Sequence, residues 1–197
     1  MVTIMELTNS GGTSTAHRTL ADLEACLDYV RQSPRDVGRL ELLVCRPEVN
    51  SREVLDEGRL DRVHGLVGDN WSARGSSSKP DRSSDPNKQI TIVNARVIGV
   101  LAGGKDRWPL AGDQLFVDFD LSASNIPPGT RIQMGSAVLE VTALPHRGCQ
   151  KFTARFGRDA TAFVNSTAGV ELNLRGINAR VVQDGAIRVG DSVRKLA

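Results

Sequence analysis

The chain has 197 residues, enough for one sizeable hydrophobic core, and its 25 Lys and Arg against 23 Asp and Glu leave a net charge of +2. That small charge, with only one Tyr, two Trp and five Phe, argues against a nucleic-acid-binding surface of basic patches or stacked bases. No stretch approaches the roughly eighteen apolar residues of a membrane span, and no basic segment leads into an apolar run at the N-terminus, so we expect a cytoplasmic protein.

The first sixty residues contain one clear helical pattern and one strand pattern. Apolar residues recur every three or four positions between 17 and 33, which predicts one amphipathic helix that ends before Pro34. Residues 39–45 (RLELLVC) are apolar and alternating, as in a strand. Residues 51–60 are charged, and we expect them to form a single exposed turn of helix.

The middle of the chain begins with a polar segment. Residues 72–89 are rich in Ser, Pro, Asp, Arg and Lys, which predicts a flexible loop, and residues 90–100 (ITIVNARVIGV) are rich in β-branched residues, which predicts a strand. Residues 99–106 (GVLAGGKD) approach the pattern of a phosphate-binding P-loop. Asp106 stands where that motif needs a Ser or Thr hydroxyl for magnesium, so a glycine-rich turn is the preferred interpretation.

The second half is dominated by short strand patterns. Strands are predicted at 114–119, 130–134 and 137–144. Residues 151–165 favour a helix interrupted at Gly157, and Asp184-Gly185 favours a hairpin between strands at 177–182 and 186–193. These elements indicate a mainly β protein with short helices, of the α+β class, with a barrel favoured over a doubly wound sheet.

Neither the histidines nor the acidic residues form an evident chemical motif. The three histidines are widely separated and no Cys or His cluster has zinc spacing, so we predict no metal site built from protein ligands alone. Asp113, Asp118 and Asp120 lie close together beside a strand, a pattern typical of a solvated face.

The three cysteines form no C-x-x-C pair, which indicates free thiols in a reducing compartment. Cys26 and Cys45 fall within an apolar helix and an apolar strand, where a thiol fills space in the core. Cys149 instead follows a turn and precedes a predicted helix. A helix N-terminus and nearby cations favour thiolate, although the local residues alone are equally consistent with a buried core thiol. The nearby cationic residues are His146, Arg147, Lys151 and Arg155.

Five segments together resemble the MOSC domain family, which is named for the C-terminal domain of molybdenum cofactor sulfurase. They are residues 65–69 (GLVGD), 112–116 (GDQLF), 128–141 (PGTRIQMGSAVLEV), 145–157 (PHRGCQKFTARFG) and 185–191 (GAIRVGD). The resemblance implies a MOSC-type β-barrel over 65–197. It also implies an N-terminal helical and extended extension over 1–64 that packs on the barrel.

The family resemblance assigns the chemistry to Cys149, which alone matches the family's cysteine position. In the family this cysteine is proposed to carry sulfur or to contact molybdenum in the molybdenum cofactor. The cofactor is a pterin with a terminal phosphate, which guanidinium groups suit. The candidate cofactor-binding residues are His146, Arg147, Lys151, Arg155, Arg175 and Arg180. The common family pattern has proline before the cysteine, whereas Gly148 stands there in this chain and predicts a more flexible turn.

The resemblance leaves three functions open. The first is a protein that binds molybdenum cofactor, or carries sulfur for it, through Cys149, with a persulfide donor such as a cysteine desulfurase as partner. The second is a molybdenum-cofactor-dependent oxidoreductase that reduces N-hydroxylated compounds, with Cys149 as the molybdenum ligand and a separate electron-transfer protein. The third is a non-catalytic small-ligand or interaction domain. We expect no pyridoxal phosphate domain in this chain, because only about sixty residues precede the barrel.

Overall fold

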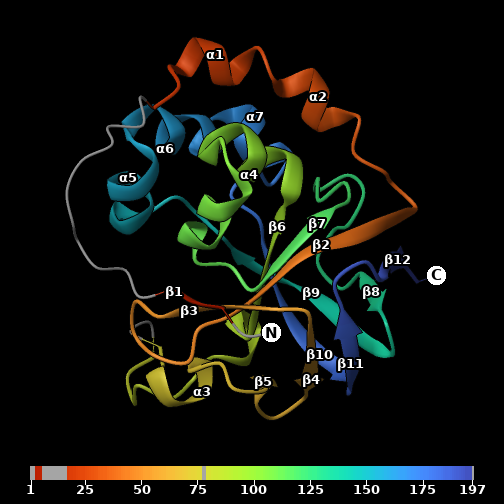
Figure 1. Cartoon of the computed structure of the whole chain (residues 1–197). Helices are drawn as coiled ribbons and strands as arrows, with labels where there is room; N and C mark the ends of the chain where they lie inside the picture. Colours follow the sequence, from red (N-terminus) through yellow and green to blue (C-terminus); the bar gives the residue numbers. More distant parts are fainter. Residues whose placement is uncertain (1–2, 6–16, 77–78, 197) are drawn as a thin grey trace.

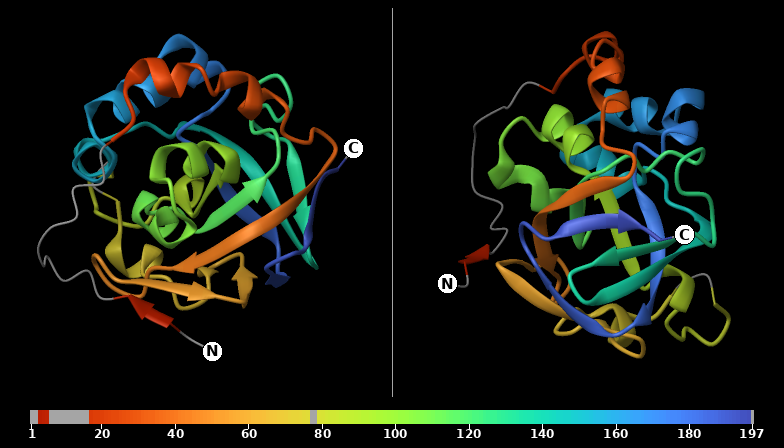
Figure 2. Two further views of the ribbon diagram at one scale, coloured as in Figure 1. Left: turned by 45° about the horizontal axis from the view of Figure 1, so that its top comes forward. Right: turned by 90° about the vertical axis from the view of Figure 1, so that its right-hand side faces the viewer.

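The fold is built around a closed β-barrel (Figures 1 and 2). The structure, a computed structural model, describes residues 3–5, 17–76 and 79–196. Within these residues, seven strands follow the order β2-β12-β8-β9-β10-β6-β7, and a β2–β7 pairing closes the sheet. The strands are β2 (Val37–Cys45), β6 (Ile90–Asn94), β7 (Leu115–Asp118), β8 (Arg131–Met134), β9 (Ala137–Pro145), β10 (Ile177–Gln183) and β12 (Ser192–Lys195). The predicted α+β barrel is therefore confirmed.

Five further strands extend the barrel or form a small sheet beside it. β1 (Thr3–Met5) and β3 (Arg52–Leu55) continue the sheet outward from the C-terminal half of β2. β4 (Glu57–Asp61), β5 (Gly65–Leu66) and β11 (Gly185–Arg188) form a separate sheet in the order β11-β4-β5. β2, which falls in the segment predicted as an N-terminal extension, is thus itself a barrel strand.

The helices gather mainly at one end of the barrel, with α3 at the opposite end (Figure 1). The α-helices are α1 (Leu20–Glu24), α2 (Leu27–Arg31), α3 (Trp71–Arg74), α4 (Ala95–Ala102), α5 (Gln150–Phe156), α6 (Arg158–Asn165) and α7 (Thr167–Glu171). Two 3-10 helices, η1 (Pro86–Lys88) and η2 (Lys105–Ala111), complete the set. Among the described residues, no helix is long and apolar enough to cross a membrane.

Two hydrophobic cores explain why residues 42–45 of β2 and most of β6 and β7 are apolar. On β7, Leu115 and Val117 point into the barrel core, whereas Phe116 packs in a second core with α4, α5 and α6. The same alternation occurs on β2 and β6. A strand covered on both faces needs apolar side chains at every position, as in the buried strands of layered folds.

Two N-terminal predictions differ from the structure. The helix predicted over 17–33 is two short helices, α1 and α2, separated by a break at Ala25 and Cys26. The predicted helical turn at 51–60 is wrong, because this segment forms β3 and β4. Cross-strand pairing with β2 and β11 overrides the polar local pattern there.

Two later strand predictions also change. Residues 90–100 divide into β6 and α4, because the Asn94 side chain accepts a hydrogen bond from the Arg96 N–H and caps the helix. The predicted hairpin across Asp184-Gly185 is wrong. β11 pairs with β4, while β12 pairs with β2 and β8, and the Asp184 carboxylate accepts hydrogen bonds from Arg62.

The segment predicted as a flexible loop at 72–89 contains most of α3 and all of η1, apart from positions 77 and 78, which lie outside the described residues. Its last residue, Gln89, is buried. The Gln89 side chain donates to the carbonyl of Arg62 and accepts from the N–H of Val181. The loop therefore ends at an anchored side chain between the small sheet and the barrel. The glycine-rich turn at 103–104 lies between α4 and η2.

A buried ion pair ties the end of β2 to the segment before α3. The carboxylate of Asp69 accepts two guanidinium hydrogen bonds from Arg46, at 2.8 and 2.9 Å, and backbone hydrogen bonds from Arg46 and Trp71. The Asp69 side chain is fully buried, and that of Arg46 is 6% exposed.

We predict that Asp69→Ala lowers the free energy of unfolding by about 3–5 kcal/mol, because it leaves the Arg46 charge buried without its carboxylate. Urea denaturation followed by circular dichroism measures the change. Glu57→Ala is the matched control, since the Glu57–Arg188 pair is exposed on both sides and its loss should change stability little. A similar loss in both variants would contradict the prediction.

Candidate functional site

Cys149 lies exposed at the junction between β9 and α5. It is the N-cap residue of α5, and its carbonyl accepts hydrogen bonds from the backbone N–H and the hydroxyl of Thr153, at 2.9 and 3.2 Å. The sequence-based prediction of a thiol at the start of a helix is confirmed. Cys149 is also the exposed member of the three free cysteines, since Cys45 is buried and Cys26 is intermediate.

Gly148, directly before the cysteine, is held by the end of α6. Its N–H donates to the Asn165 side chain at 3.0 Å, and Asn165 donates back to its carbonyl at 3.3 Å. A Cβ at position 148 would lie 3.1 Å from a Val164 methyl group and 3.3 Å from one of Thr161. Gly148 therefore permits close packing and keeps an N–H that proline would lack, while the more flexible turn stays a prediction.

The turn at 110–113 is the meeting point of three arginines. Each guanidinium donates to a backbone carbonyl of this turn. Arg155 donates to Leu110 at 2.7 Å, Arg175 to Ala111 at 3.0 Å and Arg46 to Gly112 at 2.9 Å. Arg46 comes from the end of β2, Arg155 from α5, and Arg175 from the segment between α7 and β10. The turn therefore joins three distant parts of the chain.

Two buried carboxylates compensate two of these charges. Arg46 pairs with Asp69, and Arg175 pairs with Asp113 at 2.7 Å. The Arg175 guanidinium also lies over the Phe152 ring, 4.8 Å from its centroid. Asp113 is fully buried, so the prediction that it belongs to a solvated face is wrong for this residue.

Arg52 adds a further cation that has no carboxylate partner among the described residues. It is 9% exposed, donates to the carbonyl of Ser51, and leaves its buried Nε without a partner. Burial lowers the pKa of Arg52 to about 10, and the nearby charges of Arg155 and Arg46 add to that lowering. A buried guanidinium surrounded by like charges indicates a place for an anion.

Arg155 links this cation to the cysteine. From Gly112, whose φ is +85°, a Cβ would lie 3.4 Å from the Arg52 guanidinium and 3.6 Å from that of Arg155. Burial lowers the pKa of the Arg155 guanidinium, and the positive charge of Arg175 lowers it further. The Cys149 side chain raises the same pKa. The exposed thiol of Cys149 stands at the start of α5, the helix that carries Arg155. We call Arg46, Arg52, Arg155 and Arg175 the arginine cluster.

His146 lies beside the arginine cluster as a neutral side chain. Burial lowers its pKa to about 3, and the charge of Arg175 opposes protonation more than Asp113 favours it. Its Nδ1 is 3.6 Å from Asp113 Oδ1, and neither atom has a hydrogen-bond partner in the described structure. The expectation that His146 supplies a positive charge is therefore wrong.

The remaining predicted residues take different places. Arg147 and Lys151 are exposed beside Cys149. Arg180 lies on β10 and pairs across the sheet with Glu140 on β9. Sequence reasoning missed Arg46 and Arg52, because a single arginine after or within a short strand carries no signal that it is buried.

Within the described part of the chain, no group of three or more His, Cys, Asp or Glu side chains is placed to hold a metal ion. The arrangement instead offers one accessible sulfur and several fixed guanidiniums. Guanidiniums in general pair with anionic groups, and an accessible thiol can form a bond to sulfur or to a metal.

The fold and site define a small α+β barrel with an accessible cysteine at the start of a helix. The chain belongs to the MOSC domain family, whose match covers residues 86–194. That segment includes Cys149, His146, Arg155 and Arg175, whereas Arg46 and Arg52 lie before it.

Two crystal structures of bacterial proteins share this fold. The YuaD protein from Bacillus subtilis is 20% identical, with 80% of this chain and 94% of that chain covered and a TM-score of 0.55. YiiM from Escherichia coli is 18% identical, with 81% and 70% covered and a TM-score of 0.52. At these identities the likeness concerns the fold alone. No curated protein matches the chain.

We predict that iodoacetamide modifies Cys149 in the folded protein and spares Cys45. Cys149 is exposed, whereas Cys45 is 3% exposed and burial raises its pKa to about 11. Peptide mapping by mass spectrometry measures the extent of labelling, with Cys149→Ser as the control that loses the fast modification. Equal labelling of Cys45 and Cys149 before denaturation would contradict the structure.

We predict that His146 makes stability fall as the pH is lowered from about 6.5 toward 3. In that window the unfolded chain binds a proton at this residue and the folded chain does not. The free energy of unfolding then drops by up to about 1.4 kcal/mol per pH unit. Urea denaturation at several pH values, compared with His146→Gln, isolates this contribution. Parallel pH profiles of the two proteins would show that the histidine is not buried in its neutral form.

Proposed function

We propose that this protein binds molybdenum cofactor, or carries sulfur for it, through Cys149, and that the arginine cluster holds the anionic end of the ligand. One observation carries the proposal. Cys149 is exposed at the start of α5, the helix that carries Arg155. The guanidiniums of Arg155 and of the buried Arg52 both border Gly112, and Arg52 has no carboxylate partner among the described residues. Membership of the MOSC domain family supports this choice of ligand.

The residues present suit the cofactor's chemistry. A terminal phosphate would accept hydrogen bonds from the guanidiniums of Arg52 and Arg155 and remove the repulsion between them. Cys149 would hold the opposite, metal-bearing end as a thiolate ligand. When bound, the cofactor supplies redox chemistry at molybdenum. Neutral His146, next to Asp113, adds no charge to the site.

The sulfur-carrier form of the proposal requires only sulfur exchange. The thiolate of Cys149 attacks the outer sulfur of a donor persulfide, such as that of a cysteine desulfurase. A new S–S bond forms at Cys149, the S–S bond of the donor breaks, and the donor sulfur leaves as a thiolate. No further oxidant or reductant is consumed.

We predict that protein purified from a host that makes the cofactor contains molybdenum and pterin, measured by elemental mass spectrometry and pterin fluorescence. Cys149→Ser should lose the molybdenum. Arg52→Gln should lower pterin content by about tenfold or more, because a charge-assisted contact to phosphate is lost. Arg180→Gln is the matched control, since Arg180 is engaged by Glu140 and should leave both contents unchanged.

A second measurement covers the sulfur-carrier form. After incubation with a cysteine desulfurase and cysteine, intact mass spectrometry should show one added sulfur atom in the wild type and none in Cys149→Ser.

Arg52→Gln should unfold at the same temperature as the wild type or higher, since it removes an uncompensated buried charge. Wild-type protein without molybdenum, pterin or added sulfur would overturn the proposal.

A further inference from the structure

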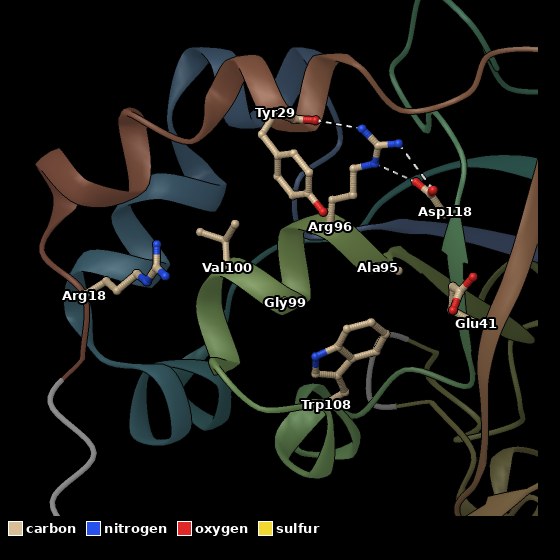
Figure 3. A pocket seen from close by; sticks show the side chains of 9 residues that line it. All are labelled: Arg18, Tyr29, Glu41, Ala95, Arg96, Gly99, Val100, Trp108 and Asp118. Atoms are coloured by element: carbon tan, nitrogen blue, oxygen red, sulfur yellow. Dashed lines mark hydrogen bonds and ion pairs between the residues drawn. The ribbon is translucent and has the colours of Figure 1, made fainter.

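A cavity that is separate from Cys149 and the arginine cluster lies where the N-terminal helices meet α4 and η2 (Figure 3). It encloses about 380 Å³, which is within the usual size range of small-molecule sites. Arg18, Tyr29 and Glu41 line it from the part of the chain before the family match, whereas Arg96 and Trp108 line it from within that match. None of its lining residues belongs to the arginine cluster.

Two aromatic rings border this cavity. Tyr29 and Trp108 extend into it from opposite sides, and Gly99 of α4 lies between them (Figure 3). Trp108 is braced by stacking on Phe116, with ring centroids 6.1 Å apart. A Cβ at Gly99 would lie 3.6 Å from the Trp108 ring, so glycine leaves the helix surface flat at this point. Arg96 lies over the Tyr29 ring, 5.1 Å from its centroid, and Lys105 lies over the Trp108 ring at 5.3 Å. A planar ligand ring would stack on the aromatic surface that these two cations leave open.

Most charges at the cavity are already paired. Arg96 donates to Asp118 at 2.7 and 3.3 Å and to the carbonyl of Tyr29 at 3.1 Å, so all three guanidinium nitrogens are occupied. Glu41 lies 3.6 Å from Lys105 and 4.0 Å from Arg39. The carboxylates of Asp118 and Glu41 are therefore both paired with cations of the protein, so neither requires a cationic ligand.

Of the two arginines that line the cavity, Arg18 is the one without a carboxylate partner among the described residues. Its guanidinium donates to the sulfur of Cys26 at 3.5 Å, and sulfur is a weak acceptor. The nearby carboxylate of Asp22 is instead bonded to the backbone N–H and the hydroxyl of Thr19. In Figure 3, Arg18 and Glu41 lie at opposite ends of the cavity, with the two aromatic rings between them. One end of an aromatic cavity thus offers a cation to an anionic ligand.

We propose that this cavity binds a small aromatic carboxylate, with the ring between Tyr29 and Trp108 and the carboxylate on Arg18. A guanidinium fork pairs with a carboxylate through two parallel hydrogen bonds, which fixes the direction of the ligand. Because Arg18 directly precedes α1 and Tyr29 lies on α2, the ligand bridges the N-terminal segment to the barrel. This site is independent of the function proposed for Cys149.

The test uses benzoate as the probe and the two tryptophan indole N–H signals in a ¹⁵N NMR spectrum. Trp71 is 4% exposed and does not line the cavity, so its signal serves as an internal reference. Benzoate should shift the Trp108 signal, and the neutral analogue benzamide should bind at least about tenfold more weakly. Benzylamine, which carries a cation, should bind more weakly still.

Variants of the protein test whether Arg18 contacts the carboxylate of benzoate. Arg18→Gln should weaken benzoate binding about tenfold or more and leave benzamide unchanged, whereas Arg31→Gln, on the exposed side of α2, should change neither. Cys149→Ser should bind benzoate like the wild type, which separates this site from the cysteine. An unshifted Trp108 signal, equal binding of benzoate and benzamide, or a preference for benzylamine would each overturn the proposal.

Discussion

Backbone carbonyls of the turn at 110–113 hold the helical layer and the barrel in one arrangement. Three guanidiniums from separate parts of the chain donate to three consecutive carbonyls. Backbone acceptors cannot be deprotonated or swing away as side chains do, so the arginines are fixed independently of any ligand. The positive charge at the site is therefore built in before binding. This arrangement requires that Asp69 and Asp113 remain buried beside it.

Packing in the two hydrophobic cores fixes the position of this turn. β6 and β7 face the barrel core on one side and the helices on the other, so a shift of either strand would disturb both cores. The turn directly precedes β7, and α5 packs in the outer core through Phe152 and Phe156. The position of the thiol thus follows from apolar packing, whereas its surroundings follow from paired charges.

Much of this fold is predictable from local patterns. The strands at 39–45 and 137–144 and the helices interrupted at Gly157 follow from alternation, periodicity and a glycine break. The strands at 184–193 were not predictable in the same way, because their pairing partners are distant in sequence. The strands at 51–60 have near partners in β2 and β5, but their charged residues hide the strand pattern. Residues 90–100 combine a strand and a buried helix that have the same β-branched composition, which is a known ambiguity of short apolar runs.

The functional site was likewise predictable from the sequence only in part. Cys149 stands out because of its neighbours and the family resemblance, and its exposed position before α5 agrees with that prediction. Arg46 and Asp113 give no such signal, since their ion-pair partners lie 23 and 62 positions away. An arginine and an aspartate at those separations look like ordinary surface charges in a sequence. Only the folded chain brings them into a common interior.

The closure of the barrel has a consequence for how the chain folds. β2 forms its N-terminal contacts with β12, so that Ser192 pairs with Arg39, about 150 positions earlier. The antiparallel pairs β8–β9 and β9–β10 and the helices α5 to α7 come from the second half of the chain. Local contacts form faster than distant ones, and the entropy of closing a long loop must be offset before such a pair is stable. The arginine cluster unites residues from both halves, so it assembles only after these long-range contacts have formed.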